Sequence, residues 1–158
     1  MAARTVRRQT DHMDNVATTV RAVANLVNVS TLAGLVIARA GKAELSHGPR
    51  GLWYAEHYRL PFPVAGAFTV GNVIITPRSV AEIGGAVLAH EERHTWQYMV
   101  FGAFFLPLYV TAMGWSWIRT GDRAARNAFE RAAGLADGGY ADVPVRPLRS
   151  LCERRLSG

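Results

Sequence analysis

The chain has 158 residues, of which 49% are hydrophobic and 19% charged. This length fits one domain with its own core, although the composition is apolar for a soluble domain and leaves membrane association open. A net charge of +6 favours acidic partners, yet the excess lies partly at the two ends of the chain. Basic ends are more typical of solubilising arms, so nucleic-acid binding is the weakest of the readings that this charge allows.

Targeting features are few. The single cysteine, Cys152, excludes an internal disulfide. Asp11 and Asp14 interrupt the basic N-terminus before any apolar stretch, so we read no signal peptide and expect the protein in the cytoplasm or on the cytoplasmic face of a membrane. We expect residues 1–13 to form a basic arm, residues 14–136 a single domain, and residues 137–158 a tail with a short helix over 148–156.

The first predicted element is a helix from Asp14 to Ala40, with a kink near Ser30. Its apolar residues recur at steps of three and four, and Gly41 is a plausible stop; the residues are Val16, Val20, Val23, Val27, Leu32, Leu35 and Val36. A bilayer span needs about twenty mainly apolar residues. Because Asn25 and Asn28 interrupt the uncharged run, we expect this helix to pack in a core.

A small sheet is predicted next. The aromatic-rich run 52–58 lies between Gly- and Pro-rich clusters, which indicates a short strand set in loops. The β-branched runs 67–70 and 73–76 flank Gly71-Asn72, a connection typical of a β-hairpin.

A well-marked helix follows the hairpin. Ser79 and Glu82 form a Ser-x-x-Glu capping box after Pro77. Apolar and histidine residues then share one helical face, namely Ile83, Val87, His90, His94 and Tyr98. Gly84-Gly85 weakens the helix locally, so we expect these glycines to allow a close packing contact.

This helix carries His-Glu-x-x-His, the pattern with the clearest chemistry in the chain. Residues four apart lie one turn above the other, so His90 and His94 can direct two imidazoles at one point, with Glu91 beside it. Zinc accepts imidazole nitrogens and leaves a position for water, whose proton a neighbouring glutamate can take. The competing reading is a charged, solvated helix face whose two histidines align by chance.

The nineteen residues 100–118 carry no formal charge, which raises a transmembrane helix as an alternative. Pro107, with Gly102 and Gly114 on either side, favours a bent or interrupted segment instead. A further helix is predicted from Asp122 to Ala133, ending at Gly134.

A two-histidine zinc site usually takes a third protein ligand. No histidine follows His94, so we expect a downstream carboxylate; the candidates are Asp122, Glu130, Asp137, Asp142 and Glu153. Glu130 is favoured because it lies mid-helix beside apolar residues, against the alternative of a surface acid balancing Arg126 or Arg131. If residues 100–118 crossed a bilayer, His94 and Glu130 would lie near opposite faces, so we expect this segment to turn back or to pack in the core.

Three motifs together resemble the small bacterial gluzincin-type zinc metallopeptidase-like domains: residues 90–97, the apolar segment around 102–109, and Asn127-Ala128-Phe129-Glu130-Arg131. The resemblance covers roughly residues 70–133. It implies a mainly helical α+β, minimal zincin-like fold with a small β-hairpin or sheet ahead of the HExxH helix. It also implies Zn²⁺ ligands His90, His94 and Glu130, with Glu91 as general base and Gln97 and Asn127 as supporting residues.

The predicted function is peptide-bond hydrolysis by a zinc-bound water, with Glu91 as base and a peptide or protein as substrate. The residues that could stabilise the oxyanion are Tyr98, Tyr109, Tyr140 and His57. The alternative is a non-catalytic, pseudo-peptidase accessory subunit of a membrane-associated complex, docking through the apolar run and the basic ends.

Overall fold

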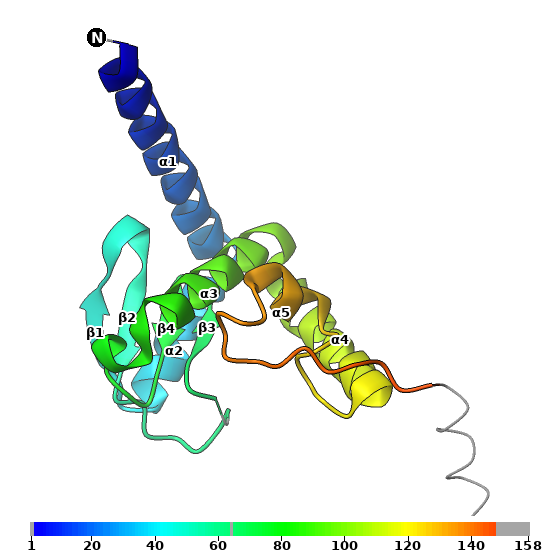
Figure 1. Cartoon of the computed structure of the whole chain (residues 1–158). Helices are drawn as coiled ribbons and strands as arrows, with labels where there is room; N and C mark the ends of the chain where they lie inside the picture. Colours follow the sequence, from blue (N-terminus) through cyan, green and yellow to red (C-terminus); the bar gives the residue numbers. More distant parts are fainter. Residues whose placement is uncertain (1, 64, 148–158) are drawn as a thin grey trace, which may run out of the picture. The chain divides into compact units, whose positions relative to one another are not determined.

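The computed structural model describes residues 2–63 and 65–147, and only the backbone of residues 2–12 (Figure 1). The chain comprises two compact units, Met1–Ala103 and Phe104–Gly158, and the structure defines each unit on its own. The fold is mainly helical α+β, as predicted, with a four-stranded mixed sheet ahead of a 41-residue helical run. The predictions for Cys152, Glu153 and a helix over 148–156 concern residues outside the described part of the chain.

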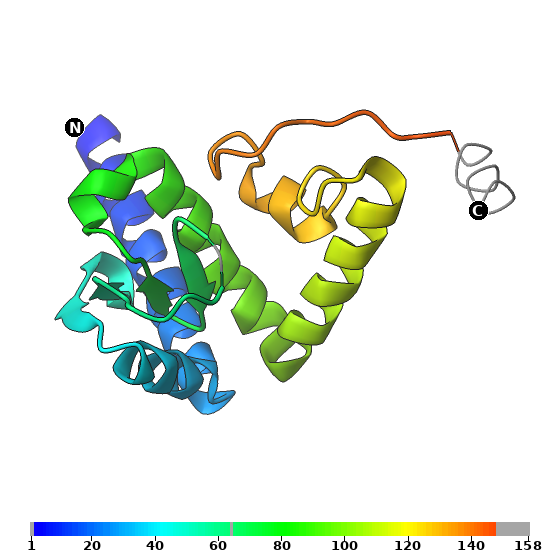
Figure 2. The same ribbon diagram turned by 90° about the horizontal axis from the view of Figure 1, so that it is seen from below.

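In the first unit two helices come first, four short strands follow, and a third helix ends the unit (Figures 1 and 2). Its elements are α1 (Ala2–Val27), α2 (Ser30–Ala40), β1 (Glu44–His47), η1 (Pro49–Gly51), β2 (Trp53–Glu56), β3 (Phe68–Val70), β4 (Val73–Ile75) and α3 (Val80–Phe101). The second unit contains α4 (Phe105–Thr120) and α5 (Ala128–Ala133), and the short turn η2 (Gly102–Phe104) separates α3 from α4.

The sheet has the order β1-β2-β4-β3, which places β3 at one edge. The predicted hairpin is confirmed: β3 and β4 pair antiparallel with Val70 opposite Val73, and Gly71 takes φ 62° in the turn. The predicted strand in 52–58 is β2, which pairs parallel with β4 and antiparallel with β1. Strand β1 was not predicted, because its four residues are all exposed and carry no burial pattern.

The core of the first unit lies between α2 and the sheet, where Ala38, Ala55, Tyr58, Val73 and Ile75 are buried. Gly34 allows this close packing, since a Cβ there would collide with the carbonyl oxygen of Val70 and the side chain of Val73. The small residues of α2 therefore set its distance from the hairpin.

Helix α3 begins as predicted. The Ser79 side chain accepts a hydrogen bond from the amide of Glu82 at 3.3 Å, and the Glu82 carboxylate accepts one from the amide of Ser79 at 3.0 Å. The expectation for Gly84-Gly85 is wrong: in the part of the chain that the structure describes, no neighbouring atom lies within 4 Å of a Cβ built at either glycine. Gly84 instead has φ 80°, a conformation that interrupts the helix and that side-chain-bearing residues rarely adopt.

Helices α1 and α2 differ most from expectation. The helical pair bends by 72°, with the break at Asn28 and Val29, close to the predicted kink. Of the seven apolar residues expected in the core, six are exposed, with Val20 56% and Val27 76% accessible, and only Leu35 is half-buried against the core. Arg21 and Asn25, in contrast, are fully buried. The periodicity identified the apolar face of α1 correctly, but the prediction that this face is buried in the core is wrong.

The apolar segment after α3 and the start of α5 also differ from the prediction. The interruption in the apolar segment falls at Gly102, which has φ 53°, while Pro107 sits in the first turn of α4, where its missing N–H leaves no helical bond unmade. Helix α5 begins at Ala128 rather than at Asp122, because the Asn127 side chain caps it; it ends before Gly134 as predicted.

Two parts of the described chain have the length and composition of a membrane span. The helical run Val80–Thr120 satisfies this criterion, with 11% of its apolar window buried, and so does the bent pair Met13–Val27 and Ser30–Ala40 taken together. The core helices of soluble proteins satisfy the same criterion. The burial and the polarity of the side chains must therefore decide whether a helix lies in a protein core or in a membrane.

Candidate metal centre

The two histidines of the His-Glu-x-x-His pattern lie one turn apart on α3 and point together. His90 is 1% exposed and His94 7%, and their Nε2 atoms are 3.1 Å apart. Two nitrogens at the usual Zn–N distance of about 2.0–2.1 Å in a tetrahedral shell lie about 3.3 Å from each other. The observed separation therefore fits two corners of a zinc coordination shell.

Gln97 fixes the orientation of one imidazole. Its Oε1 lies 2.8 Å from Nδ1 of His94, and an amide oxygen can only accept a hydrogen bond. Nδ1 of His94 consequently carries the proton, and the lone pair of Nε2 faces His90. Outer hydrogen bonds of this kind set the tautomer of metal-binding histidines. Gln97, which was expected to support the site, thus contacts His94 directly.

The carboxylate of Glu91 is held by the neighbouring hairpin. Glu91 is 5% exposed, and the hydroxyl of Thr69 in β3 donates a hydrogen bond to its Oε2 at 2.7 Å. The same hydroxyl lies 3.2 Å from the Glu91 carbonyl oxygen. Sequence reasoning missed Thr69. The one available signal was a polar residue in the middle of an otherwise apolar strand next to the motif.

Arg21 of α1 contacts the turn of α3 that carries His94. Arg21 donates to the Thr95 hydroxyl at 3.1 Å, pairs with Glu92 at 3.4 Å, and lies 5.4 Å from the ring centroid of Trp96. Burial lowers the pKa of Arg21, and the charge of Glu92 partly offsets that effect. These contacts anchor the turn of α3 that carries His94 to helix α1.

In the second unit, Glu130 lies on the short helix α5. It is 2% exposed, and the hydroxyl of Tyr109 in α4 donates a hydrogen bond to its Oε1. The Asn127 side chain accepts a hydrogen bond from the amide of Phe129 at 3.0 Å, which fixes the start of the helix one turn ahead of Glu130. A buried, oriented carboxylate contradicts the alternative of a surface acid balancing Arg126 or Arg131.

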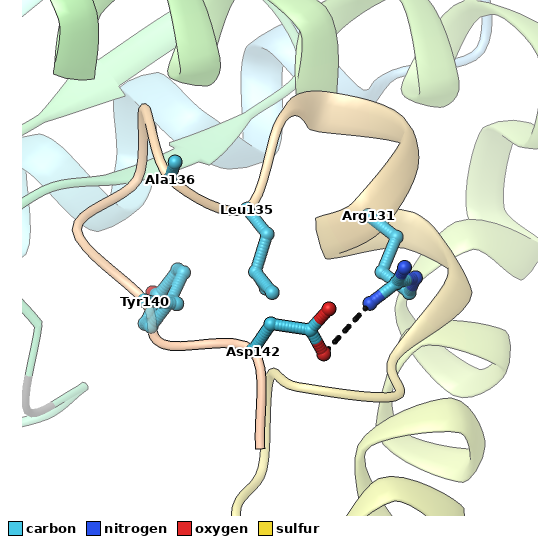
Figure 3. Close-up of a pocket in the computed structure, with 5 residues that line it drawn as sticks. All are labelled: Arg131, Leu135, Ala136, Tyr140 and Asp142. Carbon is cyan, nitrogen blue, oxygen red and sulfur yellow. Dashed lines mark hydrogen bonds and ion pairs between the residues drawn. The ribbon is translucent and has the colours of Figure 1, made fainter. Parts of the chain in front are cut away.

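The other described downstream acids have different roles. Asp142 pairs with Arg126 at 3.2 Å and Arg131 at 3.3 Å, beside a pocket of about 300 Å³ (Figure 3). Asp122 accepts hydrogen bonds from the amides of Ala124 and Ala125, both at 2.8 Å, and so closes a turn. Asp137 is half-buried in the loop after α5. Glu130 is therefore the most deeply buried of the candidate acids in the described part of the chain.

The residues that could donate a hydrogen bond to the oxyanion differ in their burial and in their contacts. Tyr98 is 5% exposed, and burial raises its pKa to about 12, so it stays a neutral hydrogen-bond donor. Tyr109 is committed to Glu130. His57 is exposed, and Tyr140 lines the pocket beside Asp142 (Figure 3).

His90 and His94 in the first unit and Glu130 in the second are each buried, and together they are the residue types of a His-His-Glu metal site. Imidazole and carboxylate donors of this composition suit zinc. Comparison with family models, curated proteins and solved structures found no match for this chain. The functional argument therefore rests on the residues themselves.

Proposed function

We propose that the protein is a zinc-dependent peptide hydrolase of the gluzincin-like type, with His90, His94 and Glu130 as the zinc ligands. The observation that carries the proposal is the histidine pair: two buried Nε2 atoms lie 3.1 Å apart, and a hydrogen bond to Gln97 fixes the tautomer of one of them. A chance alignment on a solvated helix face would leave both rings exposed and unoriented. Glu130 supplies the carboxylate that this donor set requires.

Glu91 is the proposed general base. Zinc at this site would supply Lewis-acid polarisation of the scissile carbonyl and activation of water. Thr69 binds one carboxylate oxygen of Glu91 through its hydroxyl. That contact restricts rotation of the carboxylate, so the other oxygen can take the proton of the attacking water and pass it to the leaving amine.

The sheet supports a peptide as the substrate class. Strand β3 is the edge of the sheet and contains Thr69, the residue that contacts Glu91. An extended peptide can add to such an edge by main-chain hydrogen bonds, which would run its backbone past the catalytic carboxylate. The substrate would thus be recognised mainly by its backbone, with side-chain pockets adding selectivity.

The decisive experiment compares Glu91→Gln with Glu92→Gln, the same chemical change one residue along. Glu92 faces Arg21 and Arg50 rather than the histidines. We expect Glu91→Gln to abolish cleavage of a generic peptide library while zinc stays bound, because the ligands are intact and only the base is lost. Glu92→Gln should cleave within a few-fold of the unmodified protein.

Two results would contradict the proposal. Unchanged cleavage by Glu91→Gln would remove Glu91 as the base. A protein that binds one zinc but never cleaves peptides would instead favour the accessory-subunit alternative.

A further inference from the structure

The bent helix pair α1–α2 carries a continuous apolar surface. Between residues 20 and 36 every exposed residue is aliphatic, a set we call the aliphatic face: Val20, Val23, Leu26, Val27, Val29, Leu32, Ala33 and Val36. The fully buried residues of the same stretch include Arg21 and Asn25, and Ser30 and Thr31 are also buried. From residue 20 to residue 31 the buried side chains are therefore polar, whereas the exposed side chains of the helix pair are aliphatic as far as Val36.

This polarity is the reverse of what water selects. In water, burying valine and exposing asparagine stabilises a helix, because apolar burial contributes about 25 cal/mol per Å². In lipid the polar side chains turn inward and hydrogen-bond one another, while aliphatic side chains face the acyl chains. Asn25 follows the second rule, since it donates to Asn72 Oδ1 and to the carbonyl of Thr95, both at 2.8 Å.

The bend between the helices is suited to an apolar medium. Val29 occupies the left-handed region at φ 60° and is 58% exposed, where glycine or asparagine would be usual at an aqueous turn. Asn28 satisfies the polar groups around it: its amide donates to the carbonyl of Tyr98 at 3.0 Å, and its oxygen accepts from the amide of Ser30 at 3.1 Å. The turn thus presents a hydrocarbon tip with its hydrogen bonds closed internally.

Charge and shape indicate the kind of apolar medium. Arg39 and Lys42 are exposed at the end of α2, the sequence adds Arg4, Arg7 and Arg8 at the start of α1, and the chain carries +6 overall. An apolar groove of about 620 Å³ runs beside Arg39; its lining residues are Leu32, Leu35, Val36, Arg39, Leu45 and Trp53. A hydrocarbon groove with a cation at its rim matches an acyl chain below an anionic headgroup.

We propose that the aliphatic face lies against an anionic lipid bilayer, with the Val29 turn inserted among the acyl chains and Arg39 and Lys42 at the headgroups. Buried aliphatic area and attraction to anionic lipid together give such surfaces their affinity. The proposal is independent of zinc and of hydrolysis, because no residue of the metal site belongs to the aliphatic face.

The test is flotation of the purified full chain with vesicles of phosphatidylcholine and phosphatidylglycerol. We expect the chain to float with the vesicles. The double variant Val23→Glu/Val27→Glu should bind at least about tenfold more weakly, since it replaces two exposed aliphatic contacts by charges. A second variant on α2, Leu32→Glu/Val36→Glu, should show the same loss.

The matched control is Val145→Glu, which changes an exposed valine of the second unit and should float like the unmodified chain. Helix content by circular dichroism should be unchanged in the glutamate variants, because every substituted side chain is exposed. Flotation that both double variants leave unaltered would overturn the proposal. The proposal would also be overturned if the chain did not bind vesicles but formed a dimer that the Val23→Glu/Val27→Glu substitutions dissociate. That result would show that the aliphatic face binds a second copy of the chain.

Discussion

Replacing Asn25 by alanine tests the inverted polarity of α1. The Asn25 side chain is fully buried and donates hydrogen bonds to Asn72 Oδ1 and to the carbonyl of Thr95, both at 2.8 Å. Alanine removes both donors and leaves two buried acceptors without them. Each such loss costs about 1–3 kcal/mol.

Two such losses would sum to about 2–6 kcal/mol, and we expect a value in the lower part of that range. Asn72 keeps a second anchor, since its amide still donates to the carbonyl of Ala22 at 3.0 Å, and the Thr95 carbonyl lies within helix α3. Alanine also favours the helix slightly. We therefore expect Asn25→Ala to lower the free energy of unfolding by about 2–4 kcal/mol.

The control is Val23→Ala on the same helix, at a side chain that is 54% exposed. Little buried area is lost there and helix propensity improves, so the expected change is less than about 1 kcal/mol. Urea unfolding followed by circular dichroism, in one buffer for all variants, gives both values. If Val23→Ala costs more than Asn25→Ala, the valine face is the packed one and the polarity argument fails.

Three further predictions concern the candidate site and its helix. Gln97→Leu and Tyr109→Phe each remove one hydrogen bond to a proposed zinc ligand. The zinc affinity of each variant, measured by competition titration, should therefore fall about 10- to 100-fold. An unchanged affinity would show that the hydrogen bond does not support zinc binding. Ser79→Ala should cost about 1 kcal/mol of stability in urea unfolding through loss of the cap. Hydrogen bonds from Ser79, chiefly from its backbone N–H, lower the pKa of Glu82, so the contribution of this carboxylate is complete above its ordinary pKa and is lost as pH falls through the lowered one. If acidification destabilises the unmodified protein no more than it destabilises Glu82→Gln, this linkage is refuted.

Local chemistry explains which parts of the fold could be predicted. The Ser79–Glu82 box, the Gly71-Asn72 turn and the Gly134 stop are each decided by two or three adjacent residues, and all three are found. The histidine face of α3 follows from helical spacing alone, and His90 and His94 are buried together as expected.

Features decided by distant residues or by the surrounding medium could not be predicted in this way. The spacing of valines in α1 identifies an apolar face but does not show what covers that face. Arg21 and Asn25 are buried because their hydrogen-bond partners come from η1, α3 and the hairpin turn. Thr69 contacts Glu91 across 22 positions of sequence, which no local pattern encodes. The start of α5 moved because Asn127 caps it while Asp122 closes a separate turn.

The most direct measurement of the central claim is the zinc content of the full chain and three variants, His94→Ala, Glu130→Ala and Asp142→Ala. The proposed site predicts one zinc per chain in the unmodified protein, loss of zinc in the first two variants, and full retention in Asp142→Ala, whose carboxylate pairs with Arg126 and Arg131. If Glu130→Ala retained zinc, the third ligand would be Asp137 or Glu153 instead of Glu130. A full chain that binds no zinc would contradict the metal centre itself.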